Sequence, residues 1–195
     1  MHCIGKMSYD IHLVRRGSFA CYLEWESTLQ NEAQEINPGL PNLAKEQQKE
    51  RLAALLRETN PVLEPFEFGF AAIAESQGIS EEEARIRWRH IELNGPDDGN
   101  GIQITLYDDT ADITVPYWHQ DDAATVVFEE IWRYLHIFET SGQFLAADPQ
   151  LQRFLDLSID QPAVVARYTA VVAKMPEIIA DIESRPKPKP WWKFW

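Results

Sequence analysis

Cysteine is scarce in this sequence of 195 residues, where only Cys3 and Cys21 occur. Two cysteines are too few for a disulfide framework, and neither has His or Cys nearby at the spacing of a zinc site. Long apolar runs are also missing, so we expect neither a signal peptide nor a membrane-spanning helix. The composition therefore predicts a cytoplasmic protein with reduced thiols.

The sequence also lacks the short motifs of the common enzyme classes. Its histidines have no HxxxH or HxH spacing, no serine lies in a GxSxG elbow, and no glycine-rich phosphate loop occurs. Residues 97–101, DDGNG, resemble part of a calcium loop but lack the closing glutamate. We expect no cofactor and no bound metal, and the sequence favours a protein that is not an enzyme.

Charge is abundant and unevenly distributed. The net charge is −13, yet residues 185–195 hold four bases and no acid. The remaining 184 residues therefore hold 14 bases against 31 acids, a charge of −17. A strongly acidic body repels nucleic acid and attracts basic partners, although solubility alone also accounts for such a charge.

The clearest structural pattern lies in residues 101–117, where apolar and polar side chains alternate on both sides of Asp108-Asp109-Thr110. This alternation predicts a β-hairpin with one buried face. A strand over about 89–94 precedes it, so the three strands predict an antiparallel meander. Residues 9–13 alternate in the same way and predict an N-terminal strand that joins the sheet.

Helical periodicity marks other segments. Apolar residues recur at three- and four-residue steps over about 122–140 and 161–174. Residues 44–59 predict a helix with Leu52, Leu55 and Leu56 inside, and with a solvated side made of Lys45, Glu46, Lys49, Glu50 and Arg57. Residues 18–31 fit either a helix or a strand. We expect the alternating Phe66, Phe68 and Phe70 to be core anchors.

These elements predict an α+β fold: an antiparallel meander sheet of about three to five strands, packed by several helices, with an extended C-terminal tail. We expect a single domain over residues 1–184, in which residues 1–6 form a leader before Met7, and a tail over 185–195.

The meander places two loops at the same end of the sheet, because the first and third strands run in the same direction. We therefore expect Asp97 and Asp98 to approach the turn that follows the hairpin. That turn and the next helix hold Trp118, His119, Asp121, Asp122 and Glu129. These side chains predict an acidic and aromatic partner-binding surface, with solvated turn residues as the plain alternative.

The tail is the least usual segment. Alternate prolines in residues 185–190, RPKPKP, favour an extended polyproline conformation. It carries the aromatic side chains Trp191, Trp192, Phe194 and Trp195. Docking into a partner, contact with a membrane surface and folding back onto the acidic body all remain open, and membrane attachment by so short a segment is weak.

Two further motifs accompany the hairpin: Met7-Ser8-Tyr9-Asp10 near the start and Asp148-Pro149-Gln150 late in the chain. With these motifs around GIQITLYDDTADITVPYWH, the chain resembles a family of uncharacterised bacterial proteins similar to the immunity proteins of polymorphic and contact-dependent toxin systems. The resemblance covers most of residues 7–172. It implies a protein that binds a toxin, and it transfers no active site.

We therefore expect a non-enzymatic immunity protein that neutralises a basic toxin domain by stoichiometric binding. One alternative is an adaptor that works through its aromatic tail. The other is an enzyme that uses Asp97, Asp98, His119 and Asp121. The sequence does not determine the oligomeric state.

Overall fold

The computed structural model describes residues 8–29, 40–96 and 99–184, so the expected leader and tail lie outside it. The strands are β1 (Ser8–Arg15), β2 (Glu64–Pro65), β3 (Ile91–Asn94), β4 (Gln103–Leu106), β5 (Thr110–Pro116), β6 (Phe144–Asp148) and β7 (Arg153–Phe154). The helices are α1 (Tyr22–Leu29), α2 (Leu43–Thr59), α3 (Phe70–Gln77), α4 (Glu81–Arg87), α5 (Asp121–Gly142), α6 (Gln161–Val172) and α7 (Met175–Ser184).

These elements form an α+β fold in which all strands of the described chain join one antiparallel sheet. The strand order is β2-β3-β4-β5-β1-β6-β7. The predicted meander is confirmed as β3-β4-β5, and the N-terminal strand β1 pairs with β5 on one side and β6 on the other. The expected number of strands was too small, because seven strands form the sheet. The two-residue strands β2 and β7 are too short to show any periodicity.

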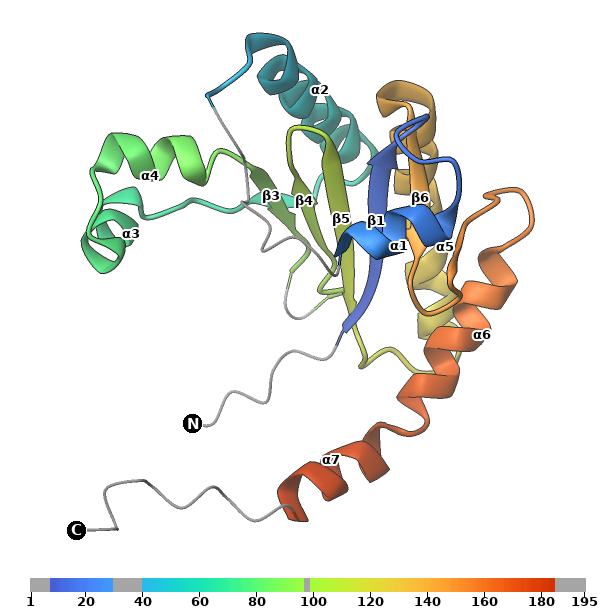
Figure 1. Cartoon of the computed structure of the whole chain (residues 1–195). Coiled ribbons are helices and arrows are strands. Elements are labelled where there is room, and N and C mark those ends of the chain that lie inside the picture. The colour runs from blue at the N-terminus through green and yellow to red at the C-terminus, as the bar shows by residue number, and fades with distance from the viewer. Residues whose placement is uncertain (1–7, 30–39, 97–98, 185–195) are drawn as a thin grey trace, which may run out of the picture.

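Helices pack on both faces of the sheet, as Figure 1 shows, with α2 and α5 behind it and α1 in front of it. The main core fills the layer between α2, α5 and the sheet. It includes Tyr9, Ile11 and Leu13 of β1, each at most 1 % exposed. A smaller cluster on the other face joins α1 to the sheet through Val14, Tyr22, Trp25 and Ala147. No helix among the described residues is long and apolar enough to cross a membrane.

The two family-like motifs meet in this fold. The hydroxyl of Tyr9 in β1 donates to Oδ2 of Asp148, which ends β6, at 2.6 Å. Oδ1 of Asp148 accepts from the backbone N–H groups of Gln150 and Leu151, so this buried carboxylate also shapes the turn after β6. Burial and the hydrogen bond to Asp148 raise the pKa of Tyr9. The two motifs therefore serve structure, since a buried carboxylate without such donors is costly.

The phenylalanines of residues 66–70 correct the sequence interpretation. Phe66 is 50 % exposed, and Phe68 and Phe70 are half-buried, so none of them is a core anchor. Phe66 and Phe68 precede α3, and Phe70 begins it; α3 and α4 project to the side of the sheet in Figure 1. Ala74 and Ala84 are the buried side chains of those two helices. Because the buried side chains of α3 and α4 are alanines, these helices bury little apolar area against which the phenylalanine rings could pack.

The prediction that Lys49 lies on the solvated side of the helix over residues 44–59 was also wrong. Lys49 is 2 % exposed and lies in the interior between α2 and the sheet. Helix α2 itself matches the prediction, and its N-terminus is capped by Oδ1 of Asn42, which accepts from the N–H groups of Ala44 and Lys45. A buried lysine at this place requires acidic partners, and these are described below.

Candidate functional site

The turn after β5 forms one end of the sheet together with the loop between β3 and β4. Nε2–H of His119 donates to the carbonyl oxygen of Asn100 at 2.8 Å. Gly101 has a positive φ of 57°, and the indole of Trp118 lies where its Cβ would be. The two loops thus meet, as the meander predicts, and only glycine fits beneath Trp118.

His119 supports this turn from within. It is 7 % exposed, and its backbone N–H donates to the hydroxyl of Tyr168 at 3.2 Å. Tyr168 in α6 in turn donates to the carbonyl oxygen of Pro116. Burial lowers the pKa of His119. This histidine therefore holds the turn in place and leaves Trp118, which is 52 % exposed, as the outward-facing aromatic side chain.

Helix α5 continues the exposed surface from this turn. Asp122, Val126 and Glu129 follow at steps of four and three residues, so they share one side of the helix over about 10 Å. All three are exposed, and Val126 is 61 % exposed. Asp121 at the start of the helix is exposed as well. We call Trp118, Asp121, Asp122, Val126 and Glu129 the end patch.

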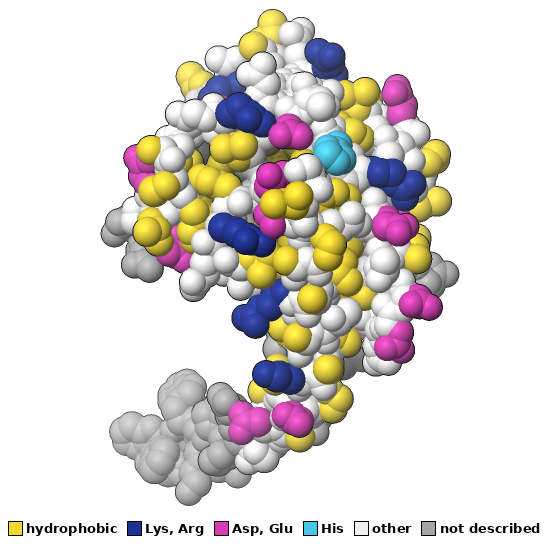
Figure 2. All heavy atoms as spheres, turned by 90° about the vertical axis from the view of Figure 1, so that its right-hand side faces the viewer, with side chains coloured by type: hydrophobic (Ala, Val, Ile, Leu, Met, Phe, Trp, Pro, Cys, Tyr) yellow, Lys and Arg dark blue, Asp and Glu magenta, His cyan; other side chains and the backbone are white. Residues whose placement is uncertain are grey.

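The end patch carries uncompensated negative charge. Within the described residues, Asp121, Asp122 and Glu129 form no ion pair with a basic side chain. Figure 2, which views the side on the right of Figure 1, shows acidic and basic side chains interspersed with apolar ones. The end patch is therefore a surface of exposed carboxylates beside an exposed indole and an exposed valine.

The half-buried Glu130 connects the loop before β4 to the helices. The carboxylate of Glu130 accepts from the side-chain amide of Asn100 at 3.1 Å and from the hydroxyl of Tyr134 and the amide of Asn60. Asn60 caps the end of α2. Burial, with the hydrogen bond to Glu130, raises the pKa of Tyr134. These bonds fix the loop beneath Trp118 to two helices, so the exposed side chains start from a rigid base.

The predicted binding residues divide into three groups. Trp118, Asp121, Asp122 and Glu129 are all exposed, whereas His119 is buried. Asp97 and Asp98 lie outside the described residues, although the adjacent Asn100 and Gly101 contact the turn. The tail residues Trp191, Trp192, Phe194 and Trp195 also lie outside them. Sequence reasoning did not single out Val126, which lies beside the apolar stripe of this helix in the sequence.

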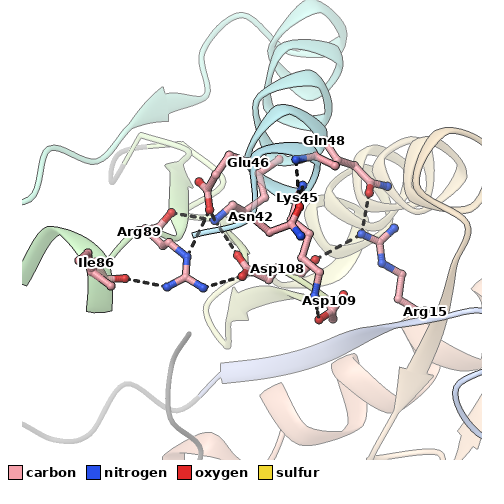
Figure 3. A network of polar contacts seen from close by, with 11 residues as sticks. Arg15, Asn42, Lys45, Glu46, Gln48, Ile86, Arg89, Asp108 and Asp109 are labelled. Carbon is pink, nitrogen blue, oxygen red and sulfur yellow. Dashed lines mark hydrogen bonds and ion pairs between the residues drawn. The ribbon is translucent and has the colours of Figure 1, made fainter. Parts of the chain in front are cut away.

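A second cluster of charges is buried at the opposite end of the hairpin, in the turn between β4 and β5 (Figure 3). Asp108 receives hydrogen bonds from Nζ of Lys49 at 2.9 Å and from Nη2 of Arg89 at 2.6 Å. Glu46 pairs with the same two cations, at 3.0 Å with Lys49 and 3.2 Å with Arg89. Two anions thus neutralise two cations in a nearly closed interior site.

This cluster holds the hairpin turn against α2. Burial alone would raise the pKa of Asp108, but hydrogen bonds from Arg89 and Lys49 outweigh it and lower that pKa. Arg15 extends the contacts to β1, since its guanidinium donates to Oε1 of Gln48 at 2.7 Å (Figure 3). The side chains of Lys49 and Arg89 are only 3 % and 7 % exposed. The cluster therefore contributes to the stability of the fold.

No group of three or more His, Cys, Asp and Glu side chains in residues 8–29, 40–96 and 99–184 has the arrangement of a metal site. In comparisons with known proteins, no family model, no curated protein and no solved structure matches this chain.

Proposed function

We propose that this protein acts by stoichiometric binding of a basic protein partner through the end patch, as an immunity protein that neutralises a bacterial toxin. The observation that supports the proposal most is the position of Trp118. Its indole packs over Gly101 and is half exposed, and carboxylates without an ion pair follow it in the sequence. Tryptophan is enriched among the residues that contribute most to protein interfaces, and exposed charges speed the encounter with an oppositely charged surface.

The geometry fits a preformed interface. His119 donates hydrogen bonds to Asn100 and Tyr168, and Tyr168 donates to Pro116, so the turn that carries Trp118 is fixed. The carboxylates of α5 lie on a helix rather than on a loop. Binding then orders few side chains, which reduces the entropic cost of association. A basic surface, such as the substrate site of a toxin that acts on nucleic acid, is the chemically matching partner.

The first test identifies the partner and its activity together. The full chain, immobilised as bait, is incubated with lysate of its native host, and captured proteins are identified by mass spectrometry. Each captured protein is then expressed alone and with this chain. We expect one basic protein that arrests growth when expressed alone and is harmless in equimolar co-expression with this chain.

Two variants connect the result to the end patch. Trp118→Ala should abolish both capture and protection, whereas Glu58→Gln, an exposed position on α2, should preserve both. Capture of a harmless protein, or full protection by Trp118→Ala, contradicts the proposal. Asp121→Asn with Asp122→Asn should slow association most at low ionic strength, because salt screens exposed charges.

A second candidate function is that of an adaptor working through its C-terminal segment. Helix α7 leads away from the sheet in Figure 1, so the last described residue, Ser184, lies far from the core. On α7, Ile182 is 40 % exposed. A bait that ends at Ser184 separates the two functions. The adaptor function requires that this shortened bait captures nothing, whereas the immunity function requires that it captures the same protein as the full chain.

A further inference from the structure

The face of the sheet opposite the main core carries a row of polar side chains across four strands. Glu92 of β3 lies opposite Thr105 of β4, Thr105 opposite Asp112 of β5, and Asp112 opposite His12 of β1. The residues between them along each strand, such as Ile11 and Leu93, belong to the core on the other face. With strands about 4.8 Å apart, the row spans about 14 Å.

A second polar row runs parallel to the first. Asn94 lies opposite Gln103, Gln103 opposite Thr114, and Thr114 opposite Asp10. The four residues are half-buried. We call the two rows together the polar floor. The polar floor is wider than the polar face of a single strand, because alternate residues of four neighbouring strands contribute to it.

Aromatic rings border the polar floor at both sides. On one side, the ring of Tyr107 lies 5.4 Å from that of His90, which lies 4.7 Å from that of Phe68. Phe66, half exposed, follows at 5.0 Å from Phe68. On the other side, α1 places Trp25 at 5.4 Å from the ring of His12. The phenylalanines that are absent from the core thus form an edge of this surface.

The charges of the polar floor are acidic. Asp10 and Glu92 form no ion pair with a basic side chain in the described part of the chain, and Asp112 pairs only with His12, at 2.6 Å. Glu92 accepts from the amide of Asn94 through Oε1 at 2.9 Å. Among the described residues, Oε2 of Glu92 and Oδ2 of Asp112 accept no hydrogen bond. Two carboxylate oxygens on either side of Thr105 therefore retain acceptor capacity.

We propose that the polar floor binds an arginine-bearing segment of a basic protein, as a second contact surface in addition to the end patch. The inference rests on the proposed function in one respect, that the partner is basic. Carboxylates bind guanidinium through two parallel hydrogen bonds. Guanidinium also stacks on aromatic rings, which the partly exposed side of the border with Phe66, Phe68 and Tyr107 provides, and it is less strongly hydrated than the ammonium of lysine.

The test uses a short peptide in which arginine alternates with glycine, acetylated and amidated at its ends. Isothermal titration measures its affinity for the full chain, and amide chemical shifts of the ¹⁵N-labelled chain locate its contacts. The control peptide replaces arginine with citrulline, which keeps the shape and removes the charge. We expect binding of the arginine peptide alone, with shifts concentrated at Glu92, Thr105, Tyr107 and Asp112.

Variants of equal charge separate a specific site from general attraction to an acidic protein. Glu92→Gln should weaken binding about tenfold, because it removes one charge-assisted hydrogen bond. Glu58→Gln, which removes the same charge from the exposed side of α2, should leave the affinity within about twofold. Thermal unfolding confirms that each variant is folded.

The inference is overturned if the citrulline peptide binds equally well, or if Glu58→Gln weakens binding as much as Glu92→Gln. It is also overturned if the shifts lie at Asp121 and Asp122 instead, since the peptide then occupies the end patch. None of these results bears on the capture test with Trp118→Ala. Failure of the second surface is thus distinguishable from failure of the proposed function.

Discussion

Replacing Asp108 with asparagine should destabilise the protein far more than the same change at its neighbour Asp109. Asp108→Asn leaves the buried cations Lys49 and Arg89 with one anion, Glu46, whose side chain is 28 % exposed. Breaking a buried ion pair by removing one partner costs about 3–5 kcal/mol, because the remaining charge stays desolvated. We therefore expect a loss of about 3–5 kcal/mol in the free energy of unfolding.

Asp109→Asn is the matched control in the same turn. Asp109 pairs with Lys45 at 2.5 Å, but the two side chains are 58 % and 37 % exposed. Exposed pairs contribute about 0–1 kcal/mol, so this variant should unfold almost like the native chain. Urea unfolding followed by circular dichroism gives both free energies, provided that fluorescence reports the same transition. Equal losses at the two positions would refute the reasoning.

The double variant tests whether the charges act as a unit. Lys49→Met alone should cost less than Asp108→Asn, about 1–3 kcal/mol, because Asp108 then keeps Arg89 and a methionine fits a site that is 2 % exposed. Combining both changes should cost less than the sum of the two, since the second change removes a charge that the first left unpaired. Strict additivity would show that the two side chains do not interact.

Three further outcomes follow from local geometry and titration. Gly101→Ala should cost roughly 1–3 kcal/mol more than Gly17→Ala in urea unfolding, because both have positive φ but only Gly101 lies under Trp118. The pKa of His12, measured by NMR, should lie above 6.5. Burial alone lowers that pKa, and the hydrogen bond with Asp112 raises it, so Asp112→Asn should lower the pKa of His12 relative to the native chain. Because the pKa of His12 is raised in the fold, the stability that the His12–Asp112 pair contributes is present at low pH and is lost as pH rises through the folded pKa. The prediction is contradicted if, over that pH range, the stability of the native chain stays constant or rises relative to that of Asp112→Asn.

Low pH should reduce the stability of the protein through Asp108, which is the opposite of its effect through the His12–Asp112 pair. Its pKa is lowered in the fold, so its ion pairs stabilise the protein above the unfolded value of about 3.9. That contribution is lost as pH falls through the folded pKa. Urea midpoints between pH 6 and pH 2 should therefore decrease more steeply for the native chain than for Asp108→Asn. Parallel pH profiles would contradict the assignment of the network.

The parts of the fold that the sequence predicted are those with local periodicity. Alternation in residues 101–117 predicted the hairpin, and helical spacing over about 122–140 predicted α5, because each pattern repeats several times within one element. Strand β2 at Glu64–Pro65 pairs with β3 over two residues, which is a single repeat of strand alternation and too short to be recognised. Long-range pairing of β1 with β6 has no local signal at all.

The side chains misassigned from the sequence are those whose environment is set by tertiary contacts. Lys49 looked solvated because lysine usually is, and only the approach of Asp108 and Arg89 makes its burial favourable. Phe68 looked like a core residue, yet its ring lies against His90 at the side of the sheet. Strand alternation identifies which residues share a face, but the row from Glu92 to His12 requires the register of four strands.

The end patch was partly predictable for a topological reason. A meander returns every second loop to the same end, so the approach of Asn100 to the turn of Trp118 followed from strand order alone. The burial of His119 did not follow, because it depends on Tyr168 in α6, 49 residues further along the chain. Val126 was not singled out, because one exposed apolar residue outside the helical stripe is by itself no signal of a binding surface.

The central claim is that a basic partner binds stoichiometrically around Trp118. Isothermal titration of the purified partner with the native chain and with Trp118→Ala tests it most directly. The account predicts one partner per chain, with an affinity at least about 30-fold weaker for Trp118→Ala, as expected for an interface anchor worth about 2 kcal/mol. An unchanged affinity in Trp118→Ala, with both proteins folded, would contradict the account.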